Sequence, residues 1–150
     1  MPPSNPPNVS RLLETPAAEP AFASAHFAAK LALETDASDL HEDLRSGVAG
    51  IVVVDARSPE GYATAHIPGA INLPHRKITS ETAAQLPKHR VIVAYCAGVH
   101  CNASTKAAAK LAALGYPVKE LVDGLEGWRK EGYPIEAGTP APLLKSLFGR

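Results

Sequence analysis

The residues best suited to chemistry are two cysteines, Cys96 and Cys101, between an apolar run and a predicted helix. Cys96 directly follows the apolar run Val91–Tyr95, and Gly98 stands in the short segment before the helix expected at Ala103–Leu114. A strand, a glycine-containing loop and a helix N-terminus together stabilise an anion through backbone amides and the helix dipole. A cysteine there is expected to have a lowered pKa, and its thiolate could attack a sulfane sulfur. A buried, inert Cys96 is the open alternative, because cysteine is also a common core residue.

The polar neighbours of Cys96 each allow more than one role. Cys101 is either a second thiol that resolves a persulfide on Cys96 into a disulfide, or a residue that only packs at the helix start. His100 either donates to a bound anion or faces solvent. Asn102 or Ser104 is expected to cap the helix. Zinc usually takes four ligands, and no second ligand pair accompanies these residues, so we predict no metal site.

The elements that position this segment alternate between strand and helix. Strands are expected at residues Ala28–Leu33 (an edge strand), Ile51–Val54, Ala70–Leu73, Val91–Tyr95 and Val118–Val122, and helices at Asp36–Arg45, Glu60–Ala65, Ser80–Leu86, Ala103–Leu114 and Leu125–Glu131. Such alternation predicts a mostly parallel sheet with helices on both faces. In these sheets ligands bind beyond the carboxyl ends of the strands. Cys96 stands at such an end.

The chain divides into an arm, one domain and a tail. Six of the first twenty residues are proline, so residues 1–21 are expected to be extended or disordered. Residues 22–136 form the predicted domain, and 137–150 form a tail. Apolar residues recur at helical spacing in that tail (Leu143, Leu144, Leu147 and Phe148). This short amphipathic helix would pack on its own domain or dock to a partner.

Composition bounds the class of protein. The 150 residues suffice for one domain with a full core. With 15 basic and 15 acidic residues the net charge is zero, which favours neither nucleic acid nor a membrane surface as a partner. The N-terminus lacks the apolar stretch of a secretory signal, so a cytoplasmic location is expected. Two cysteines do not make a disulfide framework.

Three motifs in order resemble the rhodanese family of sulfurtransferases. The first is D-A-R-S-P-E-G-Y-A-T-A-H-I-P-G-A at 55–70, the second is the Cys96 loop, and the third is G-L-E-G-W at 124–128. The resemblance covers about residues 24 to 135. It implies a three-layer α/β sandwich whose mostly parallel central sheet has about five strands.

The resemblance also implies an activity. Cys96 would carry sulfane sulfur as a persulfide held by the amides of Ala97, Gly98, Val99, His100, Cys101 and Asn102. Sulfur would pass from a small donor such as thiosulfate or a persulfide to cyanide or a thiol, and a protein acceptor is a further candidate. No metal or organic cofactor is implied.

Departures from the family pattern limit the reactions and substrates that we expect. Gly61, Ala65 and Asp123 replace residues usual in the motifs. Cys101 stands where many members have an arginine that would bind thiosulfate, so weak use of thiosulfate is predicted. Phosphatases and arsenate reductases of related fold need an arginine in C-x5-R, and Asn102 occupies that place, which argues against phosphoryl chemistry. A redox-sensing or partner-binding module that uses both cysteines remains the alternative function.

Residues of the first and third motifs have expected roles of their own. Asp55 and Arg57, at the end of a buried strand, are expected to form an ion pair or hydrogen-bond network that shapes the wall of the site, and Arg57 is also a candidate for substrate binding. His66, before a Pro-Gly turn, is expected to be a hydrogen-bonded structural residue. Trp128 is expected to pack in the core or in a lid.

Overall fold

The computed structural model describes residues 1–2 and 8–140. Within these residues one sheet of five strands is formed, in the order β1-β5-β4-β2-β3, and every neighbouring pair is parallel. The strands are β1 (Glu34–Thr35), β2 (Ile51–Asp55), β3 (Ile71–Asn72), β4 (Val91–Tyr95) and β5 (Val118–Leu121). The predicted α/β class and parallel sheet are confirmed.

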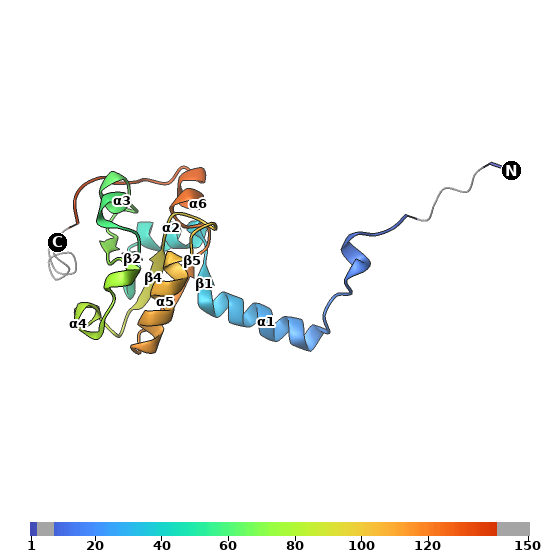
Figure 1. The fold of residues 1–150 in the computed structure, drawn as a ribbon, viewed down its shortest axis with the longest axis horizontal. Helices are drawn as coiled ribbons and strands as arrows, with labels where there is room; N and C mark the ends of the chain where they lie inside the picture. The colour runs from blue at the N-terminus through green and yellow to red at the C-terminus, as the bar shows by residue number, and fades with distance from the viewer. Residues whose placement is uncertain (3–7, 141–150) are drawn as a thin grey trace.

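Helices cover both faces of the sheet (Figure 1). The helices in the described residues are α1 (Pro20–Leu33), α2 (Ala37–Arg45), α3 (Pro59–Thr64), α4 (Ser80–Ala83), α5 (Ala103–Ala113) and α6 (Gly124–Lys130), with short 3-10 turns η1 (Leu12–Glu14) and η2 (His75–Lys77). Buried side chains of α4 and α5 pack on one face, and those of α2, α3 and α6 pack on the other. The three-layer sandwich is therefore confirmed.

The alternation of side chains along β2 and β4 builds two cores. Successive residues of a strand point to opposite faces. Val52 and Val54 accordingly join the α4/α5 core, whereas Val53 joins the core of the other face. Tyr95, the last residue of β4, also points into that second core, where its hydroxyl accepts a hydrogen bond from the Ile67 amide at 3.1 Å. The central strands are buried on both faces, which explains their continuous apolar sequence.

The predicted edge strand Ala28–Leu33 is wrong, because these residues end helix α1. Pro20 occupies the first turn, where its missing N–H costs nothing, and the alanine-rich sequence that follows favours a helix. The edge strand is instead the two-residue β1, paired with β5. Figure 1 shows α1 extending away from the sheet, and none of its residues is buried.

Other predicted boundaries hold to within a few residues. Asp36 caps α2, since its side chain accepts from the Asp39 amide at 2.8 Å. Thr79 caps α4 in a reciprocal pair with Thr82. The predicted tail helix falls on residues 141–150, outside the described residues. In the part of the chain that the structure describes, no helix has the length and apolarity needed to cross a bilayer.

Candidate active site

Cys96 lies where the sequence placed it, directly after β4 at the carboxyl end of the sheet. β4 is flanked by β5 and β2, so the loop after it opens between the ends of three parallel strands. The Cys96 residue is only 2% exposed. Cys101 is less buried, and both cysteines are free thiols. The buried sulfur of Cys96 and the more accessible sulfur of Cys101 therefore lie at the same edge of the sheet.

Backbone hydrogen bonds from the start of α6 hold the Cys96 loop in place. The amides of Leu125 and Glu126 donate to the carbonyls of Cys96 and Ala97, each at 2.9 Å. Gly124 has φ of +52°, and a Cβ atom there would lie 2.3 Å from the Cys96 carbonyl oxygen. Only glycine permits both this conformation and this close approach. The third sequence motif thus anchors the loop of the second.

The Cys96 thiol has two hydrogen-bond acceptors. Its Sγ lies 3.2 Å from the Cys101 carbonyl oxygen and 3.3 Å from Ser104 Oγ. Ser104 in turn donates to Glu120 Oε2 at 2.7 Å. Ser104 therefore does not cap α5 as expected, and Asn102, at the cap position, makes no capping hydrogen bond with its side chain. Sequence reasoning missed Glu120, which reaches the site from β5.

Burial reverses the expected ionisation of Cys96. Desolvation raises the pKa of the Cys96 thiol, and Cys101 adds to this, while hydrogen bonds from the Ser104 hydroxyl and amide oppose it. The predicted lowering of the Cys96 pKa is therefore wrong, because the residue is far less exposed than a polar loop implies. For Cys101, partial burial is outweighed by hydrogen bonds from the Ala103 amide, Cys96 and the Ala97 amide, so its pKa is lowered.

A cavity of about 280 Å³ opens onto Cys96. Its lining includes Gly98, Val99, Cys101 and Asn102 of the predicted loop, together with Ser104 and Thr105 from α5. Three acidic residues, Glu34, Glu120 and Asp123, also line it. No lysine, arginine or histidine is among the described residues of this lining. The charged side chains of this lining are therefore all acidic.

The two remaining residues of the predicted loop, Ala97 and His100, are not among the residues that line this cavity. The His100 side chain is 68% exposed, and its Nδ1 lies 3.7 Å from Glu126 Oε2, so donation by His100 to a bound anion stays a prediction. The Cys101 amide is already bonded to the Gly98 carbonyl oxygen at 3.0 Å. The cradle of amides from Ala97 to Asn102 stays a prediction.

Asp55 and Arg57 form the expected ion pair beside the site. Arg57 Nη2 lies 2.7 Å from Asp55 Oδ2, and the Arg57 amide and Nε also donate to this carboxylate. Arg57 Nη2 donates further to the Ala65 carbonyl oxygen at 2.5 Å. The positive charge of Arg57 contributes to the lowered pKa of Cys101. Nε and Nη2 of Arg57 are engaged within the protein, and substrate binding by Arg57 stays a prediction.

His66 and Trp128 have the structural roles predicted for them. His66 is buried, its Nδ1 lies 2.8 Å from the Tyr62 carbonyl oxygen, and its ring stacks on that of Tyr62. Trp128 is 1% exposed, and its indole N–H donates to the Pro134 carbonyl oxygen at 2.7 Å. Both residues support the face of the sheet covered by α2, α3 and α6.

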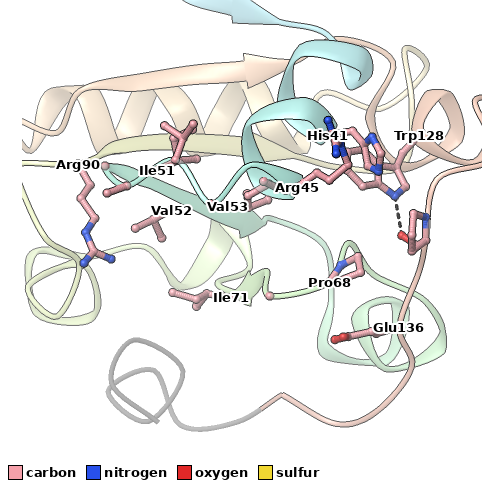
Figure 2. A pocket seen from close by; sticks show the side chains of 17 residues that line it. His41, Arg45, Ile51, Val52, Val53, Pro68, Ile71, Arg90, Trp128 and Glu136 are labelled. Carbon is pink, nitrogen blue, oxygen red and sulfur yellow. Dashed lines mark hydrogen bonds between the residues drawn. The ribbon is translucent and has the colours of Figure 1, made fainter. Parts of the chain in front are cut away.

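A larger cavity of about 700 Å³ lies elsewhere, beside α2 and β2 (Figure 2). Ile51, Val53 and Ile71 line it together with Arg45 and Arg90, and neither cysteine does. It has no nucleophile comparable to Cys96, so it is not the candidate active site. Among the described residues no three or more His, Cys, Asp or Glu side chains gather where they could hold a metal ion.

Comparisons with known proteins agree with this geometry. The family model described as Rhodanese-like domain matches residues 36–131. The HTH-type transcriptional regulator Rv0324 of Mycobacterium tuberculosis is 41% identical over 106 residues, 70% of this chain and 46% of the regulator. The chain thus spans about half the length of that relative. The thiosulfate sulfurtransferase GlpE of Pseudomonas fluorescens is 40% identical over 95 residues, 62% of this chain and 83% of that enzyme.

A solved structure is also similar. The crystal structure of the BH2092 protein from Bacillus halodurans superimposes with a TM-score of 0.78 at 47% identity. The match covers 83% of this chain and 93% of that one. The two proteins therefore share the same fold.

Proposed function

Since this chain belongs to the rhodanese-like domain family, we propose that it is a sulfurtransferase that carries sulfane sulfur as a persulfide on Cys96. The observation that carries the proposal is the position of Cys96, which directly follows the central strand β4 and lines a cavity of about 280 Å³. Similarity to the enzyme named thiosulfate sulfurtransferase GlpE supports the same class of reaction.

The proposed reaction has two transfers at one sulfur. The Cys96 thiolate attacks the outer sulfur of a donor persulfide, forming a new S–S bond, and the donor leaves as a thiolate. With thiosulfate as donor, sulfite leaves. The terminal sulfur of the Cys96 persulfide is then attacked by cyanide or by a thiolate, giving thiocyanate or a new persulfide and returning the Cys96 thiolate. A small thiol, cyanide or a protein thiol would serve as acceptor.

Mass spectrometry of the intact protein tests the proposal directly. The protein is exposed separately to thiosulfate, polysulfide and glutathione persulfide, and fragmentation locates any added sulfur. Sulfur on Cys96 that cyanide removes as thiocyanate supports the proposal. A protein that takes up sulfur from none of these donors would not be a sulfur carrier.

Thiosulfate is expected to be a poor donor. Cys101 replaces a cation that would bind the dianion, and losing such a charge-assisted contact costs about 1.5–3 kcal/mol, or about one to two decades in affinity. The carboxylates of Glu34 and Glu120 on the cavity wall add repulsion. Steady-state kinetics should therefore give a much higher KM for thiosulfate than for a low-charge alkyl persulfide.

A charge-reversal variant sharpens this test. Glu34→Lys should lower the KM for thiosulfate and leave that for the low-charge persulfide nearly unchanged, because only the dianion responds strongly to charge. A low KM for thiosulfate in the wild-type protein would show that backbone amides alone suffice to bind it.

We infer a second candidate function, redox sensing by the two cysteines, because both line the same cavity. Cys101 raises the pKa of Cys96, and Cys96 helps to lower that of Cys101, so the two thiols interact. One relative is a protein named as a transcriptional regulator, which favours a signalling use. Attack by the Cys101 thiolate on a Cys96 persulfide would release hydrosulfide and leave a Cys96–Cys101 disulfide.

The resolving role of Cys101 predicts a measurable release of sulfide. Protein loaded with sulfur should release sulfide without added thiol, and Cys101→Ala should lose this release while keeping the sulfur load. Sulfide assays and peptide maps under non-reducing conditions provide the two readouts. Equal release from Cys101→Ala, together with no linked peptide in the wild-type protein, would eliminate the resolving role and leave Cys96 as carrier.

A further inference from the structure

Glu120 is connected to the reactive sulfur through one side chain. Cys96 Sγ lies 3.3 Å from Ser104 Oγ, and Ser104 Oγ lies 2.7 Å from Glu120 Oε2. The same carboxylate oxygen accepts a second hydrogen bond from the Thr105 hydroxyl at 2.8 Å. Ser104 is 4% exposed, so little water competes for its hydroxyl. The chain of contacts runs from β5 through the first turn of α5 to the sulfur.

The direction of these hydrogen bonds decides what Ser104 offers to Cys96. A serine hydroxyl has one proton to donate and lone pairs to accept with. While that proton is directed to Glu120, the Ser104 hydroxyl accepts from the sulfur, and only a thiol has a proton to give. The hydroxyl can lower the pKa of Cys96 only when its proton turns to the sulfur. A thiolate would instead need the Ser104 proton, which is directed along the shorter contact, 2.7 Å to Glu120 Oε2 against 3.3 Å to the sulfur.

We propose that Glu120 is a positioning residue that fixes the Ser104 hydroxyl as an acceptor and thereby holds Cys96 as a thiol. This deepens the proposed function, on which its use in sulfur transfer rests. Cys96 is activated when the Ser104 hydroxyl turns from Glu120 to the sulfur. A cationic group that pairs with Glu120 favours this turn, so the site suits a sulfur donor or acceptor that carries positive charge.

Among the charged groups around Cys96, Glu120 is the one whose contacts suit this positioning role. Titratable groups surround the Cys96 region on several elements. They are Glu34 of β1, Arg57 after β2, His100 and Cys101 of the loop, Glu120 of β5 and Asp123 before α6. Arg57 is held by Asp55, and His100 faces Glu126 on α6. Among the described carboxylates of this group, Glu120 is the one that hydrogen-bonds Ser104.

Direct titration of the Cys96 thiol tests the proposal without requiring sulfur transfer. The chain has two cysteines, so Cys101→Ser leaves Cys96 as the sole thiol in the full chain. Its ionisation is followed by the ultraviolet absorbance of the thiolate, and the Cys96→Ser, Cys101→Ser double variant supplies the tyrosine background. In this setting Glu120→Gln should lower the titration midpoint by about one pH unit, which is about a tenfold rise in thiolate below the midpoint.

Two further variants separate the Ser104 connection from simple charge. Glu34→Gln removes a charge from the same cavity and should change the thiolate fraction at most about twofold, because charges exposed to solvent interact weakly. In a Ser104→Ala background, Glu120→Gln should shift the midpoint no more than Glu34→Gln does. The proposal is overturned if Glu120→Gln leaves the titration midpoint of Cys96 unchanged, or raises it, as the loss of a general base would. It is also overturned if Glu120→Gln shifts that midpoint equally with and without the Ser104 hydroxyl.

Discussion

Replacing Cys96 by serine is expected to reduce thiocyanate formation from a sulfane sulfur donor and cyanide to the rate without protein. A serine hydroxyl cannot form the persulfide that carries the sulfur between the two half-reactions. The fold should survive, because serine can donate to the Cys101 carbonyl oxygen and pair with Ser104 as the thiol does. Thiocyanate assays on folded variant and wild-type protein provide the measurement.

Cys101→Ser is the matched control for this experiment. It removes the other thiol from the same loop and leaves Cys96 in place, so sulfur loading in a mass spectrum should persist. Wild-type turnover by the Cys96→Ser protein would show that Cys96 is not the carrier, and the proposed mechanism would then be abandoned. Loss of turnover in both variants would instead mean that the transfer depends on the pair of thiols.

The central strands were predictable because they are buried on both faces. The predicted strand Val91–Tyr95 matches β4, and the predicted Ile51–Val54 is extended by one residue, to Asp55, in β2. Continuous apolar runs of this length are typical of parallel strands between two layers of helices. Because the predicted carboxyl end of β4 was correct, the predicted position of Cys96 at that edge of the sheet was correct as well.

The N-terminal edge was not predictable from local pattern. A two-residue strand such as β1 has no periodicity to detect, and Ala28–Leu33 alternates apolar and polar residues only weakly. Its helical state follows from the residues before it, since Pro20 starts α1 and alanines continue it. The strand assignment went wrong because the window of residues was too short to include that start.

Within the site, contacts between neighbouring strands were the missing information. Glu120 is paired in register with Ala94, two residues before Cys96, although the two lie far apart in the sequence. The available signal was a carboxylate near the carboxyl end of β5, which reads V-K-E-L. The ionisation of Cys96 was also misjudged, because amides and a helix N-terminus can be read from the sequence, whereas the depth of burial that opposes them cannot.

Replacing Asp55 by asparagine is expected to lower the free energy of unfolding by about 3–5 kcal/mol. The Asp55 side chain is fully buried, and that of Arg57 is 16% exposed. Removing the carboxylate charge leaves a largely buried guanidinium whose remaining protein acceptors are the Ala65 carbonyl oxygen and the new side-chain amide. Urea unfolding followed by circular dichroism gives the change in free energy, provided that the slope with denaturant is unchanged.

A second ion pair in the same chain isolates the effect of burial. Arg45 and Glu42 also have nitrogen and oxygen 2.7 Å apart, but their side chains are 64% and 59% exposed. Many exposed pairs make no measurable contribution, because water solvates each charge once its partner is lost. Glu42→Gln should therefore leave the unfolding midpoint unchanged within error. If Asp55→Asn cost no more than Glu42→Gln, the Asp55–Arg57 pair would not be a structural support of the wall beside Cys96, and Arg57 would be free to act on the substrate.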